Sequence, residues 1–161
     1  DACKVLYEKG VNFHCKYVGN WGDITEYEFL KNVKRFNIQS QITYLGAKFG
    51  EEKRHIMDAS DIFIHPTYND CFPLVLVEAM QHSLPIISTF EGGIPEIVEN
   101  GVTGFLVKQK NVKDLAERLE ELIDNPGLRR QFGNAGRTKF EKEFTLNVFE
   151  KKMNAILKSL N

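Results

Sequence analysis

The sequence predicts an α/β domain built on a doubly wound parallel sheet of about five strands and followed by a helical tail. Two observations support this fold class. Short apolar runs alternate with helical patterns along most of the chain, and then the runs stop and only helical patterns follow. Strands that alternate with helices form βαβ units, whose strands are parallel.

The predicted strands are rich in β-branched or aromatic residues and are bounded by Gly, Pro, Asn or Asp, as buried strands of a parallel sheet usually are. Each run spans four to seven residues. The predicted strands are residues 12–18, 41–45, 61–65, 84–88 and 104–107.

Helices are predicted between these strands. Thr25 and Glu28 form a capping-box pattern that opens a helix with one apolar face: Phe29, Leu30, Val33 and Phe36. Residues 50–59 carry acidic residues in their first turn, which favours the helix dipole. A third helix spans residues 73–82, with Pro73 at its first helical position, and a short one follows at Pro95.

The C-terminal part is predicted to be helical. Asn111 caps a helix whose apolar residues lie at helical spacing, and Asn125-Pro126-Gly127 ends that helix. Two more helices span residues 128–143 and 146–160. The last one carries an apolar stripe, most of which we expect to be core: Phe149, Met153, Ile156, Leu157 and Leu160.

Composition narrows the function. The chain has 161 residues, of which 42% are hydrophobic and 27% charged, which is typical of one folded domain rather than a disordered or collagen-like chain. Twenty-one Lys and Arg against 22 Asp and Glu give a net charge of −1, which disfavours general nucleic-acid binding. The first ten residues lack the apolar core of a signal peptide, and no stretch is apolar enough to span a bilayer. We therefore expect a cytoplasmic protein.

The cysteines and histidines predict neither a disulfide framework nor a metal site. Cys3, Cys15 and Cys71 are odd in number and contain no C-x-x-C pair. The histidines form no H-x-x-x-H pattern. Cys71 precedes a predicted helix, where a thiol can be acidified, but no base lies beside it in sequence, so a small apolar filler is the simpler interpretation.

The segment from His65 to Glu96 holds the candidate site. A predicted strand runs into a loop with Asp70 and then into the helix that carries Glu78. Ligands of α/β sheets bind beyond the carboxyl ends of the strands, so this loop is well placed. Glu78 lies among apolar residues and must be paired, hydrogen-bonded or directed into a cleft. From spacing alone, Glu78 can equally serve as a cap or ion pair, and Asp70 as a turn residue.

A second loop follows the next predicted strand. Gly92 and Gly93 allow the backbone to come close to a ligand, and Pro95 opens a short helix. A Gly-Gly pair on its own is also common in ordinary turns.

Together these segments resemble the C-terminal, nucleotide-sugar-binding domain of family-4 retaining glycosyltransferases, which have the GT-B fold with Rossmann-like domains. The resemblance covers nearly the whole chain. Its central element is the pair Asp70-x7-Glu78, continued by Ala79-Met80. Further matching segments are residues 17–20, 44–46, 84–88, 92–98 and 100–107.

The resemblance implies roles for individual residues. Asp70 would contact the donor sugar and help to stabilise positive charge at the reacting carbon, and Glu78 would bind the ribose hydroxyls. The backbone amides of Cys71, Phe72 and Leu74 would approach the sugar. Gly92 and Gly93 would lie near the sugar or the phosphates. The base would pack near the strand-end loop that contains Leu45, Gly46 and Lys48.

The sequence also departs from the family. Asp70 is one methylene shorter than the usual Glu, while Cys71 and Pro73 stand where glycine is common. The family's first strand, with the Arg and Lys that bind the diphosphate, has no counterpart in the sequence. We therefore expect residues 1–161 to be the donor-binding half of a two-domain enzyme whose N-terminal acceptor domain is absent. In the family the last helix often packs against that other domain, which offers a second role for the apolar stripe.

The expected function is retaining, metal-independent transfer of a hexose from a nucleoside diphosphate sugar to a glycan or lipid-linked acceptor. The expected partners are the nucleotide sugar and, through the absent domain, the acceptor, with membrane contact only at the periphery. One alternative is a nucleotide-sugar-binding module without catalysis. A GT-B sugar-nucleotide epimerase is another. A flavodoxin-like receiver is disfavoured because the acids Asp70 and Glu78 come late in the chain.

Overall fold

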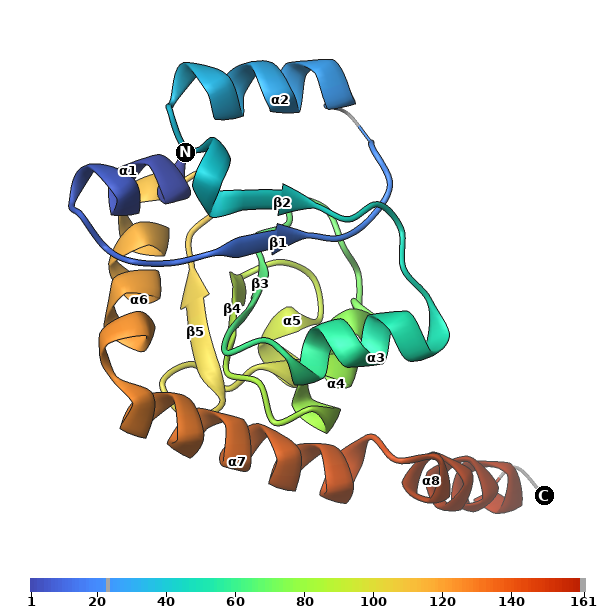
Figure 1. Ribbon diagram of the computed structural model, residues 1–161. Helices are drawn as coiled ribbons and strands as arrows, with labels where there is room; N and C mark the ends of the chain where they lie inside the picture. Colours follow the sequence, from blue (N-terminus) through green and yellow to red (C-terminus); the bar gives the residue numbers. More distant parts are fainter. Residues whose placement is uncertain (23, 160–161) are drawn as a thin grey trace.

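The computed structural model describes residues 1–22 and 24–159, and Figure 1 shows how its helices and strands are arranged. The strands are β1 (Cys15–Tyr17), β2 (Ile42–Tyr44), β3 (Phe63–His65), β4 (Ile86–Thr89) and β5 (Gly104–Val107). The helices are α1 (Ala2–Glu8), α2 (Glu26–Arg35), α3 (Gly50–Asp58), α4 (Leu74–Gln81), α5 (Ile94–Ile97), α6 (Val112–Asp124), α7 (Pro126–Glu143) and α8 (Leu146–Ser159). A short 3₁₀ turn, Gln39–Gln41, precedes β2.

The strands confirm the predicted positions and the parallel direction, but they are arranged in two groups. β1 pairs with β2, and β3, β4 and β5 pair in that order. Between the described residues of β1 and β3 no strand ladder is formed, so the expected single sheet is divided there. In the doubly wound order 3-2-1-4-5-6, the strand that separates these two groups is the first one. That is the strand that the family resemblance leaves without a counterpart.

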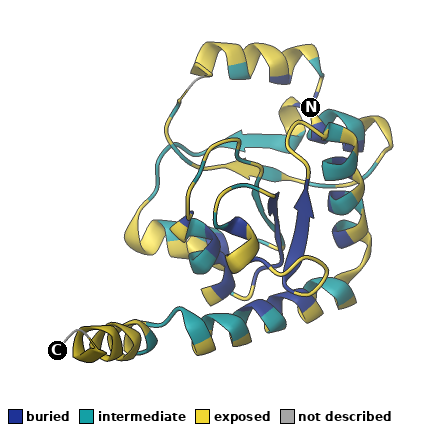
Figure 2. Cartoon of the chain, turned by 180° about the vertical axis from the view of Figure 1, so that it is seen from behind, coloured by how far each residue is buried: buried dark blue, intermediate teal, exposed yellow. Residues whose placement is uncertain are grey.

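The core lies on both faces of β4 and β5, which are buried along their whole length (Figure 2). Successive strand residues point to opposite faces. Ile86 and Leu106 accordingly join a cluster with α3, α4 and α5, whereas Ile87 and Phe105 join a cluster with α1, α6 and α7. Helices on both faces of a parallel sheet confirm the predicted doubly wound fold.

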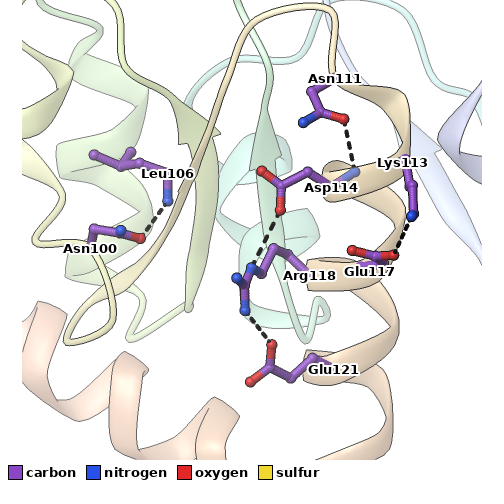
Figure 3. Close-up of polar contacts among 8 residues, drawn as sticks. All are labelled: Asn100, Leu106, Asn111, Lys113, Asp114, Glu117, Arg118 and Glu121. Atoms are coloured by element: carbon purple, nitrogen blue, oxygen red, sulfur yellow. Dashed lines mark hydrogen bonds and ion pairs between the residues drawn. The ribbon is translucent and has the colours of Figure 1, made fainter.

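The helix caps agree with the sequence in two places and differ in two. Thr25 and Glu28 form the predicted capping box, and Asn111 accepts a hydrogen bond from the amide of Asp114 at 3.1 Å (Figure 3). Pro73, however, is the N-cap of α4 and not its first helical residue. Asn125-Pro126-Gly127 ends α6 as predicted, but the next helix, α7, begins at Pro126 and not at residue 128, because Asn125 caps it and Pro126 occupies its first position.

Polar contacts tie the loop before β5 to that strand and join side chains along α6 (Figure 3). The Asn100 carboxamide oxygen accepts a hydrogen bond from the Leu106 amide at 2.9 Å, which ties the loop before β5 to the strand. On α6, Arg118 lies between Asp114 and Glu121, and Lys113 faces Glu117 at 3.8 Å. These ion pairs are largely exposed, so each contributes at most about 1 kcal/mol to stability.

Helix α2 contacts the β1–β2 group through aromatic rings that are tilted against one another. Phe29 lies 5.0 Å from Tyr17 and 5.3 Å from Trp21, and Trp21 lies 4.2 Å from Tyr44, measured between ring centroids. Leu30, which was predicted to share the apolar face, is 50% exposed. The contact face of α2 is therefore narrower than the sequence predicts.

The expectation that the apolar stripe of α8 is mostly core is wrong. Helix α8 extends beyond the end of α7 and has no buried residue over its described length (Figures 1 and 2). Phe149, Ile156 and Leu157 are each more than half exposed. Met153 is 40% exposed, and Leu160 lies outside the described residues. The stripe is amphipathic, but the described part of the chain provides no surface that covers it.

Candidate functional site

The loop between β3 and α4 is held by the buried end of β4. The Ser88 hydroxyl donates a hydrogen bond to the His65 carbonyl at 2.7 Å, and the Thr89 hydroxyl donates one to the Thr67 carbonyl at 2.8 Å. Both hydroxyl-bearing residues are buried. The start of this loop is therefore fixed at the carboxyl end of the sheet, where ligands of α/β proteins bind.

The Gly92-Gly93 turn supports the Asp70 part of the same loop. Gly92 has a φ of +47°, and a Cβ atom there would lie 2.3 Å from the Asp70 carbonyl oxygen. The Gly93 amide donates a hydrogen bond to the Cys71 carbonyl at 2.6 Å. The glycines thus allow a close backbone approach, as predicted, but the backbone that they approach is this chain's own loop. Their role toward a ligand stays a prediction.

Asp70 lies beside a histidine that the sequence did not link to it. The His65 Nε2 atom is 3.5 Å from the Asp70 Oδ2 atom, and the two side chains are 29% and 32% exposed. That nitrogen is buried and finds no hydrogen-bond partner among the described residues. Asp70 is therefore accessible from solvent on one side and flanked by an imidazole on the other.

Glu78 is paired with a lysine from the preceding helix. The Lys53 ammonium lies 2.7 Å from each oxygen of the Glu78 carboxylate. The Glu78 side chain is 38% exposed, so it is both ion-paired and within reach of a ligand. The sequence left open whether Glu78 forms an ion pair or binds a ligand, and the observed contact with Lys53 is compatible with both.

The remaining predicted residues fall into two sets. Cys71, Phe72 and Leu74 are exposed around the start of α4. Leu45, Gly46 and Lys48 follow β2 and thus belong to the other strand group. This second set is fixed by neighbours of its own.

The Leu45 amide donates a hydrogen bond to the Tyr17 carbonyl at 2.9 Å, and the Gly46 carbonyl accepts one from the Gly19 amide at 3.1 Å. The Lys48 ammonium lies 3.5 Å from Glu52. The loops that end β1 and β2 are thereby joined to each other.

Two hollows of the surface are lined by residues other than the two acids. One, of about 150 Å³, lies beyond the ends of β3, β4 and β5, and its lining includes Tyr68, Lys108 and Lys110. Another, of about 260 Å³, is lined by residues that include Asp61 and Arg129. Neither hollow contains Asp70 or Glu78, whose side chains are each partly exposed.

The thiols of the chain are free. Cys71 is exposed beside Asp70 and is not a buried apolar filler, whereas Cys3 and Cys15 are half-buried in the N-terminal part of the chain. A hydrogen bond from Cys15 lowers the pKa of Cys3 to about 7, and the same contact, together with burial, raises the pKa of Cys15. Within the part of the chain that the structure covers, no group of three His, Cys, Asp or Glu side chains could hold a metal ion. None of the described helices is long and apolar enough to cross a membrane.

Curated proteins with similar sequences are glycosyltransferases. An uncharacterized glycosyltransferase of Methanocaldococcus jannaschii is 35% identical over 137 residues, which is 85% of this chain and 38% of that protein. The amylovoran biosynthesis glycosyltransferase AmsK of Erwinia amylovora is 28% identical over 166 residues, which is 99% of this chain and 40% of that protein. The chain therefore spans about 40% of the length of these relatives.

Solved structures share the fold, and they are GT-B glycosyltransferases. The sucrose-phosphate synthase of Thermosynechococcus elongatus superposes with a TM-score of 0.86 at 21% identity, over 99% of this chain and 41% of that one. HepE of Anabaena, solved in complex with UDP, gives a TM-score of 0.81 at 23% identity, over 91% of this chain and 41% of that one. The family model described as "Glycosyl transferases group 1" matches residues 1–139. On this match, the chain belongs to the group 1 glycosyltransferase family.

Proposed function

We propose that this chain is the donor-binding half of a retaining glycosyltransferase that moves a hexose from a nucleoside diphosphate sugar to a glycan or lipid-linked acceptor. The observation that carries the proposal is the loop-and-helix unit from Asp70 to Glu78. It follows a parallel strand and carries two carboxylates, each of which is partly exposed. HepE, which shares the fold over 41% of its length, was solved in complex with UDP, and this supports nucleotide binding by the complete enzyme.

Each carboxylate suits a different part of the donor. Glu78 accepts hydrogen bonds from the ribose diol, for which a carboxylate has enough lone pairs. Asp70 accepts hydrogen bonds from the sugar hydroxyls and stabilises positive charge at the anomeric carbon. The backbone amides of Cys71, Phe72 and Leu74 approach the sugar, and the loop with Leu45, Gly46 and Lys48 receives the base.

The transfer exchanges one bond for another at the anomeric carbon. The bond from this carbon to the diphosphate oxygen breaks, and its electron pair leaves with the diphosphate. The acceptor hydroxyl oxygen forms a new bond to the anomeric carbon on the same face of the sugar, and its proton passes to the departing diphosphate oxygen. Negative charge grows on the diphosphate, where amides and protein cations can stabilise it without a divalent metal.

Three features fit a second domain that completes the site. The acids are partly exposed, β1 and β3 have edges that pair with no other described strand, and the apolar stripe of α8 is exposed. The first two features are expected of a donor-binding domain that is seen without one of its strands and without the other domain. The third offers that partner domain an apolar contact surface.

The proposal is tested by replacing Glu78 in the complete polypeptide. Glu78→Ala removes the ribose acceptor, and a hydrogen bond to a charged group is worth about 1.5 kcal/mol or more, so UDP binding should weaken roughly tenfold or more. Isothermal calorimetry with UDP gives the Kd, and release of UDP from UDP-glucose gives turnover. Glu117→Ala is the matched control, because Glu117 is also a helical glutamate that faces a lysine (Figure 3). Equal UDP affinity in both variants would contradict the role of Glu78.

A nucleotide-sugar-binding module without catalysis is the second candidate. It is favoured by Asp70, which is shorter than the glutamate usual in the family and has an imidazole nitrogen 3.5 Å from its carboxylate. In this case the wild-type complete polypeptide binds UDP and depends on Glu78, but shows no turnover with any donor and acceptor pair. Turnover that Asp70→Ala abolishes would eliminate this candidate.

A further inference from the structure

Lys53 connects two helices through the acid that the proposed function assigns to the ribose. Its ammonium, on α3, lies 2.7 Å from both carboxylate oxygens of Glu78, on α4. The contact is partly buried, with the two side chains 30% and 38% exposed. Most other ion pairs of the described residues join positions three or four apart on one helix, such as Lys4 with Glu8 and Lys113 with Glu117.

The packing of α3 against α4 places Lys53 where it can make this contact. Lys53 comes one helical turn before Met57, so the two side chains share a face of α3. Met57 is buried in the cluster that contains Leu76 and Met80 of α4. Because Met57 packs against α4, Lys53 on the same face of α3 is also directed toward α4.

The symmetric contact leaves the carboxylate able to bind more donors. An ionised carboxylate has about four lone-pair sites, of which the ammonium occupies one on each oxygen. One site on each oxygen remains, which matches two neighbouring hydroxyl donors. Lys53 also neutralises Glu78, so the negative charge of a nucleoside diphosphate meets less repulsion.

From this geometry, we propose that Lys53 is a positioning residue for donor binding. It fixes the Glu78 carboxylate with one free lone pair per oxygen directed to solvent, and it cancels a charge that would repel the diphosphate. This inference rests on the proposed function, because it assumes that Glu78 binds the ribose. Lys53 itself need not touch the donor.

The test is a double-mutant cycle on UDP affinity in the complete polypeptide. Lys53→Met should weaken UDP binding about three- to tenfold, since it removes both the fixed geometry and the neutralising charge. In a Glu78→Gln background, Lys53→Met should change the Kd little, because the carboxylate charge is already absent. Lys53→Arg should restore part of the affinity, and Lys53→Gln offers a milder change that keeps a hydrogen-bond donor.

Turnover kinetics give a second measurement, because a purely structural role of Lys53 would not change the KM alone. Lys53→Met should raise the KM for UDP-glucose with kcat little changed, as expected when ground-state and transition-state binding are lost together. Arg54→Met is the matched control, because Arg54 is the next residue of α3 and pairs with Glu51 of the same helix. It should leave both the Kd and the KM unchanged.

The outcomes separate the two proposals. If Glu78→Gln weakens UDP binding and Lys53→Met does not, or if Lys53→Met strengthens it, Lys53 is not a positioning residue although the proposed function stands. If Lys53→Met has a lower Tm but an unchanged Kd for UDP, Lys53 only stabilises the fold, and the inference is overturned. If Glu78→Gln has no effect on UDP binding, the proposed function itself fails.

Discussion

The position of Asp70 depends on Gly92 more than on any contact of the aspartate side chain. Gly92 adopts a φ of +47°, and the space that a Cβ atom would need is filled by the carbonyl oxygens of Asp70 and Cys71. A left-handed conformation costs an L-residue about 1–2 kcal/mol before any clash is counted. The sequence correctly indicated that the two glycines allow another group to come close to the backbone. The structure shows that this group is the backbone of the Asp70 loop.

Replacing Gly92 by alanine should displace the Asp70 loop. We expect Gly92→Ala to lower the free energy of unfolding by at least about 2 kcal/mol, because a clash adds to the backbone strain. UDP affinity should fall as well. Urea denaturation and calorimetry measure the two effects.

Gly101→Ala is the control for backbone strain alone. Gly101 has a φ of +81° and nothing within 4 Å of its would-be Cβ, so we expect a loss of about 1 kcal/mol and unchanged UDP affinity. Equal effects of the two substitutions would show that the approach of Gly92 to Asp70 is not important.

Single residues also show what could be predicted from the sequence. A glutamate in an apolar helix must be paired or accessible, which is why Glu78 could be selected from the sequence. Its partner Lys53 and the neighbour of Asp70, His65, could not be selected. The Lys53 contact joins residues 25 positions apart and depends on how α3 packs against α4. A helical pattern predicts on which face of its own helix a lysine lies, but it does not predict which other helix packs against that face.

Among the elements, the strands and their order along the chain were predictable, and their grouping was not. Apolar runs bounded by turn residues indicate strands, but they do not show which strands are neighbours. β1 and β3 each keep one edge without a ladder in the described residues. Unpaired edges favour pairing with another strand.

We predict that a parallel strand of the complete polypeptide lies between β1 and β3. The amides at the facing edges of β1 and β3 should then exchange with deuterium more slowly in the complete polypeptide than in residues 1–161 alone. The amides of β4, which is paired on both sides in this chain, serve as the internal reference. Identical exchange at β1 and β3 in the two proteins would contradict the inserted strand.

Helices show a similar limit of sequence reasoning. The capping residues Thr25 and Asn111 were predictable because a cap is a contact between residues three apart. Asn125 was ambiguous because it ends α6 and caps α7 at once. The exposure of α8 was not predictable, since an amphipathic pattern shows that a face is to be covered but not by which molecule.

At the scale of the whole molecule, we propose that the chain forms one side of a binding site. The doubly wound core holds the Asp70 loop and α4 after β3, and both acids are partly exposed. In this proposal the donor contacts these acids and a second domain binds the acceptor; the chain spans about 40% of the length of the relatives described above.

The most direct test is a crystal structure of the complete polypeptide with UDP-glucose. We expect both ribose hydroxyls within about 3.2 Å of the Glu78 carboxylate oxygens, and the glucose against Asp70. A nucleotide bound elsewhere, for example in the hollow lined by Lys108 and Lys110, with Glu78 contacting only Lys53, would contradict it.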